Sequence, residues 1–460
     1  MKNIYLTLFF FIGNLIYSQT NSNVLSFEEF LGYVKTTHPL TKQANLKISE
    51  AQAKLMKARG GFDPKLEADY IEKEYSNKNY YSIFNGSFKI PTWYGIEIKA
   101  AFDNSEGIYL NPENTLPNSG LTSLGISIPL GQGLWVNERM AELRKAKIYQ
   151  RVNEAERKIM LTEVIYEASQ SYLNWKRSYD EVELYKEYLK NAINRYNGVT
   201  KLIEEGDKPA IDSVEAGITV KTRKLNLENA TLKLIKAKLS VSNYLWTEDG
   251  IPIEIEEFIN PETDLDQNLL YVLKVDDFQE LSIQNHPKIE ALNSKLEILN
   301  VETKLAGNSL LPKLDVNYNY LSEPSAFDNY QFNDYKFGVN FSFPLFLRKE
   351  RANLKLAKIK VSESQFSLNF EKQLLINKIE SQKNELNSYK KQIKILSDLI
   401  GNYNLMLNAE ERLFQMGESS LFLINSRENT LVTAQLSNIQ LTNSYLQSAL
   451  DLYKTMANPE

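Results

Sequence analysis

Residues 379–414 read IESQKNELNSYKKQIKILSDLIGNYNLMLNAEERLF, and an apolar side chain recurs in this stretch at every seventh position. These positions are Ile379, Leu386, Ile393, Ile400, Leu407 and Phe414. A sustained seven-residue repeat holds one apolar seam against a neighbouring helix and imposes a left-handed supercoil. The stretch therefore predicts a long coiled-coil helix, and a plain coiled-coil stalk is one interpretation of it.

An earlier stretch repeats the pattern at a shift of 211 residues. Its matching positions are also apolar: Ala168, Trp175, Val182, Leu189, Tyr196 and Ile203. Each stretch follows a Pro-Leu pair, at 129–130 and 344–345, and no proline interrupts it before Pro209 or Pro459. We therefore predict long helices over residues 135–205 and 347–416, each of roughly 105 Å at a rise of ~1.5 Å per residue.

The first eighteen residues have the pattern of a secretory signal peptide. Lys2 precedes an apolar stretch from Ile4 to Ile16, and the small residue Ser18 suits signal peptidase. A membrane anchor is the alternative interpretation. No other run of about 18 apolar residues follows, so we predict no transmembrane helix in the mature chain.

Composition narrows the classes of function. The chain has no cysteine, which excludes disulfides and thiolate sites. Its net charge of −5 argues against a nucleic-acid partner. The only two histidines have no other ligand at metal-site spacing, and no phosphate loop is present, so we expect no metal, no cofactor and no enzyme. A secreted chain with 26 Tyr and 21 Phe suits the envelope of a Gram-negative bacterium.

The two histidines mark an internal duplication. His38-Pro39 and His286-Pro287 stand 248 residues apart, and Pro-Lys-Leu at 64–66 recurs at 312–314 with the same shift. Proline restrains the residue before it and fits the first turn of a helix, so each His-Pro pair predicts a helix start. We expect two structural repeats, 19–246 and 275–460, joined by an equatorial linker at 247–274.

Apolar residues alternate with polar ones after each Pro-Lys-Leu, which predicts β-hairpins at 66–130 and 314–345. Strands of about 10 residues with one apolar side are typical of membrane barrels, whereas a soluble sheet with one buried face is the alternative. The first hairpin contains an insertion at 80–119 that is rich in Asn, Gly and Pro. We expect it to form an ordered extracellular loop, and the alternative is an extra hairpin inside the barrel.

Shorter helices complete each repeat. Return helices are expected at 210–246 and 420–456, after the glycine turns at Gly206 and Gly417. A helix of about 22 residues precedes each Pro-Lys-Leu, so two short helices should stack end to end beside each long one. In the linker, the run Ile251–Phe258 resembles a strand.

Four strands per chain are fewer than the eight of the smallest membrane barrel. An open sheet edge cannot lie in lipid, because its backbone groups find no partners there. Chains must therefore pool strands, and three copies would give twelve. A second apolar seam on the helices also needs a neighbour.

Together, the two halves, the His-Pro helix starts, the Pro-Leu strand exits and the glycine turns resemble the TolC family of outer membrane efflux proteins. The resemblance implies a mainly α fold with membrane β-structure: a homotrimer with a β-barrel in outer membrane lipid, continued by an α-barrel through the periplasm. It implies an exit duct for tripartite efflux or type I secretion. The implied partners are a periplasmic adaptor protein and an inner-membrane pump of the RND or ABC class. A structural or adhesive coiled-coil envelope protein without transport activity is the alternative.

The resemblance also implies that the turns between long and return helices dock the adaptor. The matching residues here are Leu202, Gly206, Leu413 and Gly417. A role of the glycines in helix capping alone is the alternative interpretation.

In the family, acidic residues six and nine positions beyond the second tip glycine ring the periplasmic mouth. This chain has Leu423 and Ser426 at those positions. The 211-residue shift carries them to Asp212 and Glu215, which stand three apart and share one helix face. All four are pore-mouth candidates, and an ordinary solvated helix start that favours acids is the alternative for the acidic pair.

Overall fold

The computed structural model describes residues 23–273, 283–326, 331–457 and 459, so the expected signal peptide at 1–18 lies outside the described residues. The chain divides into two compact units. Unit 1 comprises residues up to 38, 167–276 and 386–450, and unit 2 comprises 39–166, 277–385 and 451–460. Three helices contribute to both units: α3 (Glu138–Glu204), α7 (Arg348–Gln415) and α8 (Leu421–Met456).

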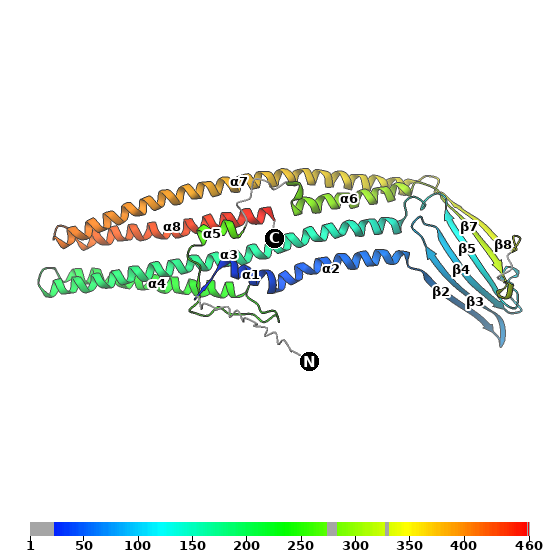
Figure 1. Cartoon of the computed structure of the whole chain (residues 1–460), viewed down its shortest axis with the longest axis horizontal. Helices are drawn as coiled ribbons and strands as arrows, with labels where there is room; N and C mark the ends of the chain where they lie inside the picture. The colour runs from blue at the N-terminus through cyan, green and yellow to red at the C-terminus, as the bar shows by residue number, and fades with distance from the viewer. Residues whose placement is uncertain (1–22, 274–282, 327–330, 458, 460) are drawn as a thin grey trace, which may run out of the picture. The chain divides into compact units, whose positions relative to one another are not determined.

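Unit 2 contains an antiparallel sheet of six strands within the described residues. Figure 1 shows the strands side by side in the order β2 (Lys65–Tyr75), β3 (Lys78–Pro91), β4 (Glu97–Glu106), β5 (Leu121–Pro129), β7 (Lys313–Ser322) and β8 (Tyr335–Ser342). Each strand is antiparallel to its neighbours. The pairing of β5 with β7 joins strands from the two repeats into one sheet.

The insertion at 80–119 supplies most of β3 and all of β4. The expectation of an extracellular loop is therefore wrong, and the alternative of an extra hairpin is correct. Because β2 pairs with β3 and not with β5, residues 66–130 form four strands and not one hairpin. The physical reason lies at Ser76 and Asn77, whose positive φ angles of 54° and 59° make the tight turn that brings β3 back against β2.

Two shorter helices pack along the long helices inside unit 2. Helix α2 (Pro39–Arg59) lies against α3, where Asn153 Nδ2 donates to the Lys47 carbonyl oxygen at 2.9 Å. Helix α6 (Pro287–Asn308) packs on α7 around the buried side chains Ile289, Leu368 and Leu375. Salt bridges on the exposed surface contribute little to stability, so the apolar contacts hold α6 against α7.

The His-Pro pairs mark helix starts, as predicted: α2 begins at Pro39 and α6 at Pro287. His286 caps α6, because its Nδ1 accepts a hydrogen bond from the Lys288 N–H at 3.1 Å. Its Nε2 lies 2.8 Å from the Thr455 carbonyl oxygen and therefore carries the proton. Burial lowers the pKa of His286, which keeps the ring in this neutral form.

Unit 1 gathers α1 (Phe27–Thr37), α4 (Ile211–Ser242), α5 (Leu265–Val272) and the parallel pair β1 (Val24–Leu25) and β6 (Asn260–Pro261). The buried side chain of Tyr172 in α3 connects β1 to β6. Its hydroxyl donates to the Leu25 carbonyl oxygen at 2.6 Å and accepts from the Glu262 N–H at 3.0 Å. The ring of Phe27 packs edge-on against Tyr172 at 5.3 Å. Burial raises the pKa of Tyr172, so the hydroxyl stays protonated and able to donate.

The linker run Ile251–Phe258 is not a strand, contrary to the sequence pattern. Pro252 forms only an isolated bridge with Trp246, because proline has no N–H to continue a ladder. The run instead folds back on the end of α4: the Ile253 N–H donates to the Leu245 carbonyl oxygen at 2.8 Å, and the Ile255 N–H donates to Ser242 Oγ at 3.1 Å.

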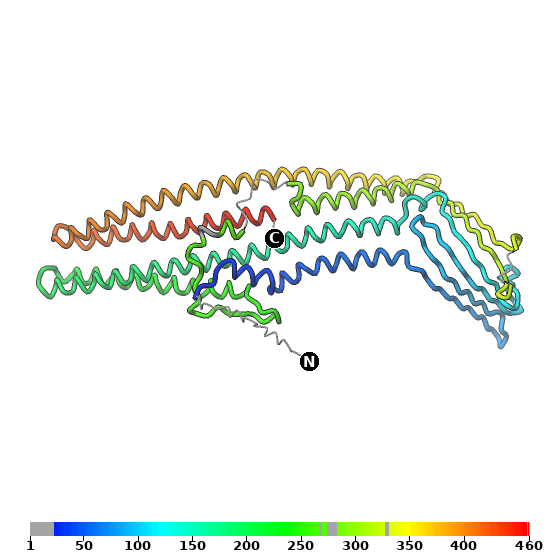
Figure 2. The backbone as a smooth tube through the Cα atoms, viewed as in Figure 1, coloured from blue at the N-terminus to red at the C-terminus, as the bar shows by residue number. Residues whose placement is uncertain are grey.

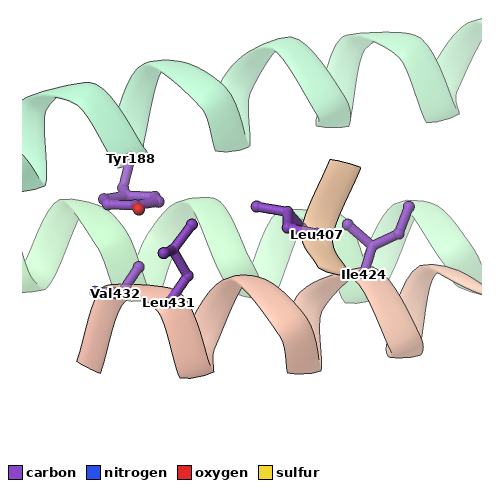
Figure 3. Packing of buried hydrophobic residues seen from close by; sticks show 5 residues of the cluster. All are labelled: Tyr188, Leu407, Ile424, Leu431 and Val432. Carbon is purple, nitrogen blue, oxygen red and sulfur yellow. The ribbon is translucent and has the colours of Figure 1, made fainter. Parts of the chain in front are cut away.

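A core cluster of unit 1 joins α3, α7 and α8. Figure 3 shows Tyr188 of α3 beside Leu407 of α7 and three residues of α8: Ile424, Leu431 and Val432. Leu407 belongs to the seven-residue repeat read from the sequence, and it is buried here. The repeat therefore does supply a packing seam.

Within the described ranges, no helix combines the length and the apolar character needed to cross a membrane.

Candidate functional site

Two tight turns end the long helices within unit 1, one between α3 and α4 and one between α7 and α8 (Figure 2). Gly206 and Gly417 adopt positive φ angles of 86° and 80°. The amide after each glycine donates to the carbonyl oxygen of Leu202 at 2.8 Å and of Leu413 at 2.9 Å. These are the hydrogen bonds of a Schellman cap, so the two leucine positions and the two glycines play equivalent parts in both turns.

The two turns pack against each other. Val199, Ala216 and Leu421 form a buried apolar cluster that joins α3, α4 and α8 next to the turns. The ammonium of Lys208, in the first turn, lies 4.6 Å from the ring centre of Phe414, in the last turn of α7. We refer to residues 202–211 and 413–422 together as the tip.

The tip exposes more apolar surface than the sequence analysis recognised. Leu413, Met416 and Phe422 are all exposed. Met416 and Phe422 were not among the docking residues predicted from the sequence. Exposed apolar side chains gathered in one place on a protein mark an interaction site more often than scattered ones do. The only feature of the sequence that could have identified Met416 and Phe422 is their position, because both lie within five residues of Gly417.

The structure brings together two of the four pore-mouth candidates. Glu215 and Ser426 line one groove of about 770 Å³, whereas Asp212 and Leu423 are not among its lining residues. Glu215 Oε1 accepts a hydrogen bond from Asn425 Nδ2 at 3.0 Å. Its carboxylate is therefore held against α8 rather than extended freely into solvent.

A buried charge cluster lies deeper in unit 1, and sequence reasoning missed it. The Glu428 carboxylate, 1% exposed, lies 3.1 Å from the Arg195 guanidinium and 3.4 Å from that of Arg223. Arg223 also donates to Asn429 Oδ1 at 2.7 Å. These contacts connect α3, α4 and α8, and the partners stand more than 200 residues apart in the chain.

The exposed side of α4 carries a second seven-residue repeat. Its members are Ile211, Ile218, Leu225, Leu232 and Leu239, which are between 49 and 67% exposed. We call this set the α4 seam. No part of the chain that the structure describes covers it, although its spacing is that of a coiled-coil contact.

The described residues hold no cluster of three His, Cys, Asp or Glu side chains arranged to bind a metal ion. What the site offers instead is a structured tip, an acidic side chain at a groove, and apolar surfaces suited to other protein chains.

Comparisons with known proteins agree with this geometry. Residues 279–458 match the family model described as outer membrane efflux protein. The fold matches the Campylobacter jejuni CmeC outer membrane channel at 15% identity and a TM-score of 0.63, over 94% of this chain and 85% of that one. The Neisseria gonorrhoeae MtrE outer membrane channel matches at 14% identity and a TM-score of 0.64, over 94% and 89%. The Vibrio cholerae outer membrane protein VceC matches at 13% identity and a TM-score of 0.64, over 94% and 95%. A search of curated proteins gave no match.

Proposed function

We propose that the chain is an outer membrane efflux protein, because residues 279–458 match that family model, and that three copies of it form the exit duct of a tripartite export system. On this proposal the chain is an outer membrane efflux channel of a Gram-negative bacterium, a transport protein whose helices extend into the periplasm. The proposal extends to its assembly and its partners.

The observation that supports assembly into a trimer is the exposed α4 seam. Five large apolar side chains in register along one helix face would cost roughly 1.5–3 kcal/mol each to leave in water instead of burying them fully. A seven-residue repeat fits the groove of another helix, and a neighbouring copy of the chain supplies such helices at the same height. When a surface patch meets a different patch on the next copy, the copies form a ring if the rotation between them closes.

The tip is the surface we assign to the periplasmic adaptor protein. Leu413, Met416 and Phe422 are exposed there, on a turn that the Schellman caps hold rigid. An adaptor that presents a helical hairpin would cover these side chains. A pump of the RND or ABC class in the inner membrane then completes the system.

The assembly is tested on purified protein in detergent. We expect a trimer by light scattering and a heat-labile trimer band on a gel, and we expect discrete conductance steps when the protein enters planar bilayers. A stable monomer that still carries membrane-inserted β-structure would contradict the proposal.

The acidic residues near the tip should tune ion selectivity. Three copies bring together six carboxylates from Asp212 and Glu215, and crowded negative charge favours cations. Asp212→Asn combined with Glu215→Gln should lower the cation preference of single channels and remove any block by multivalent cations. The control is Glu228→Gln, an exposed acid farther along α4. Unchanged selectivity and block in the double variant would show that other groups line the mouth.

A further inference from the structure

The inserted hairpin β3–β4 lies in the middle of one half of the sheet and not at its margin. It separates β2 from β5, and it is hydrogen-bonded on both sides over most of its length. A hairpin that served as a surface loop would leave β2 free to pair with β5. The register therefore makes this hairpin part of the wall.

One face of the sheet is apolar across all six strands. Because side chains alternate between the two faces, the register places these residues together: Leu66, Tyr70, Phe84, Phe88, Ile98, Phe102, Leu124, Ile126, Val316, Tyr318, Phe337, Val339 and Phe341. Each is exposed or half-buried in the chain. The inserted hairpin supplies four of the thirteen, so its apolar surface continues that of the other strands without a break.

The opposite face is mainly polar over the same strands, with the pair Ile71 and Ile83 as an apolar exception. It carries Glu67, Asp69, Ser87, Lys89, Lys99, Ser123, Ser127, Asp315, Asn317, Lys336 and Asn340, and Lys89 of the inserted hairpin forms a salt bridge with Glu67 of β2. Strands of membrane barrels present apolar side chains to lipid and polar ones to the lumen. Both faces of the inserted hairpin meet this requirement.

The sheet ends in two edges that have no partner strand among the described residues, β2 and β8. Unpaired backbone groups cannot face lipid, so another chain must cover both edges. Six strands alternate in direction, and β2 and β8 therefore run oppositely. The β8 strand of one copy can thus pair antiparallel with β2 of the next, and a ring built in this way closes with an even number of strands.

We propose that three copies close into a barrel of 18 strands, in which β8 of each copy pairs with β2 of the next and the inserted hairpins form one third of the wall. The number of copies rests on the proposed function, whereas the six strands per copy rest on the sheet. Barrel diameter grows roughly in proportion to strand number, so this barrel is about 1.5 times as wide as one of twelve strands. Barrels of 16–18 strands enclose an aqueous channel. The outer exit of the duct is accordingly a wide, water-filled opening.

The place of the inserted hairpin is tested by cysteine labelling, for which the cysteine-free chain is a clean background. Phe88 lies in the same row as Leu124, and Ser87 lies in the same row as Ser123, so β5 offers matched controls. In trimers in liposomes, a membrane-impermeant maleimide in the lumen should modify Ser87→Cys and Ser123→Cys. Phe88→Cys and Leu124→Cys should react only with a lipid-soluble maleimide. Modification of Phe88→Cys by the impermeant reagent, with Leu124→Cys protected, would overturn the proposal.

The contact between copies is tested by disulfide formation. Tyr70→Cys in β2 is combined in turn with Tyr335→Cys, Phe337→Cys, Val339→Cys and Phe341→Cys in β8, since all five side chains face the same side. At least one combination should give covalent trimers on a non-reducing gel, and each single variant should not. If trimers and conductance are present but no combination cross-links, the proposed 18-strand barrel is contradicted, whereas the proposed function as an exit duct is not. If trimers are absent altogether, the proposed function fails as well.

Discussion

Replacing Glu428 by glutamine is expected to lower the free energy of unfolding of the helices in unit 1 by about 3–5 kcal/mol, the usual cost of removing one partner from a buried ion pair. Among the described residues, Glu428 is the only acid within salt-bridge distance of Arg223, and Arg223 is itself buried. A neutral amide at this position would leave the charge of Arg223 buried without a counter-charge. Arg195 would retain only its contact with Glu411 at 3.2 Å.

The matched control is Glu411→Gln. Glu411 also contacts Arg195, but its side chain is 42% exposed, so its loss should cost less than about 1 kcal/mol. Chemical denaturation of the detergent-solubilised protein, followed by helical circular dichroism, measures both variants against the parent chain. Equal midpoint shifts for the two variants would mean that the buried cluster contributes no more than a surface pair.

Replacing both Gly206 and Gly417 by leucine is expected to reduce export at least tenfold while trimers still form. A Cβ at either position would meet no other atom within 4 Å, so the new side chains extend into solvent without a clash. The left-handed backbone adds strain of roughly 1–2 kcal/mol at each site, which is too small to prevent assembly. The leucines would therefore stand where we place the adaptor.

The readouts are survival of cells under a toxic export substrate and the trimer band on a gel. Gly198→Leu is the control, because Gly198 also has open space around it but belongs to the body of α3. Parent-level export by the double variant would contradict docking at the tip. Loss of the trimer would instead show that the turns serve assembly.

The long helices were readable from the sequence because a seven-residue repeat is a local signal. Leu386 and Leu407 are buried as that repeat requires. The glycine turns were readable for the same reason, since a glycine that ends an apolar repeat marks a left-handed cap.

The sequence did not favour the inserted hairpin, partly because the turn that leads into it from β2 lacks the usual residues. Turns with two positive φ angles favour Asn-Gly, whereas this one is built from Ser76 and Asn77. The surrounding Asn, Gly and Pro then resembled a loop. The predicted number of four strands per chain was therefore wrong, since the sheet has six among the described residues.

The charge cluster was hidden for a different reason. Arg195, Arg223 and Glu428 each stand on an amphipathic helix among many other charges, and pattern alone does not separate a buried one from its solvated neighbours. Only the fold, which brings together residues 233 and 205 positions apart, identifies them.

The small parallel pair of β1 and β6 has a consequence for the order of events during biogenesis. The Phe27 N–H donates to Glu262 Oε2, 235 residues later in the chain, and Tyr172 fastens both strands. Contacts of such long sequence separation form slowly, because a large loop must close before they are made. The segment that begins at Val24 therefore waits during synthesis for more than half of the chain to follow. During that interval its apolar residues, Phe27 and Phe30 among them, lack the contacts that bury them in the fold and are exposed to aggregation.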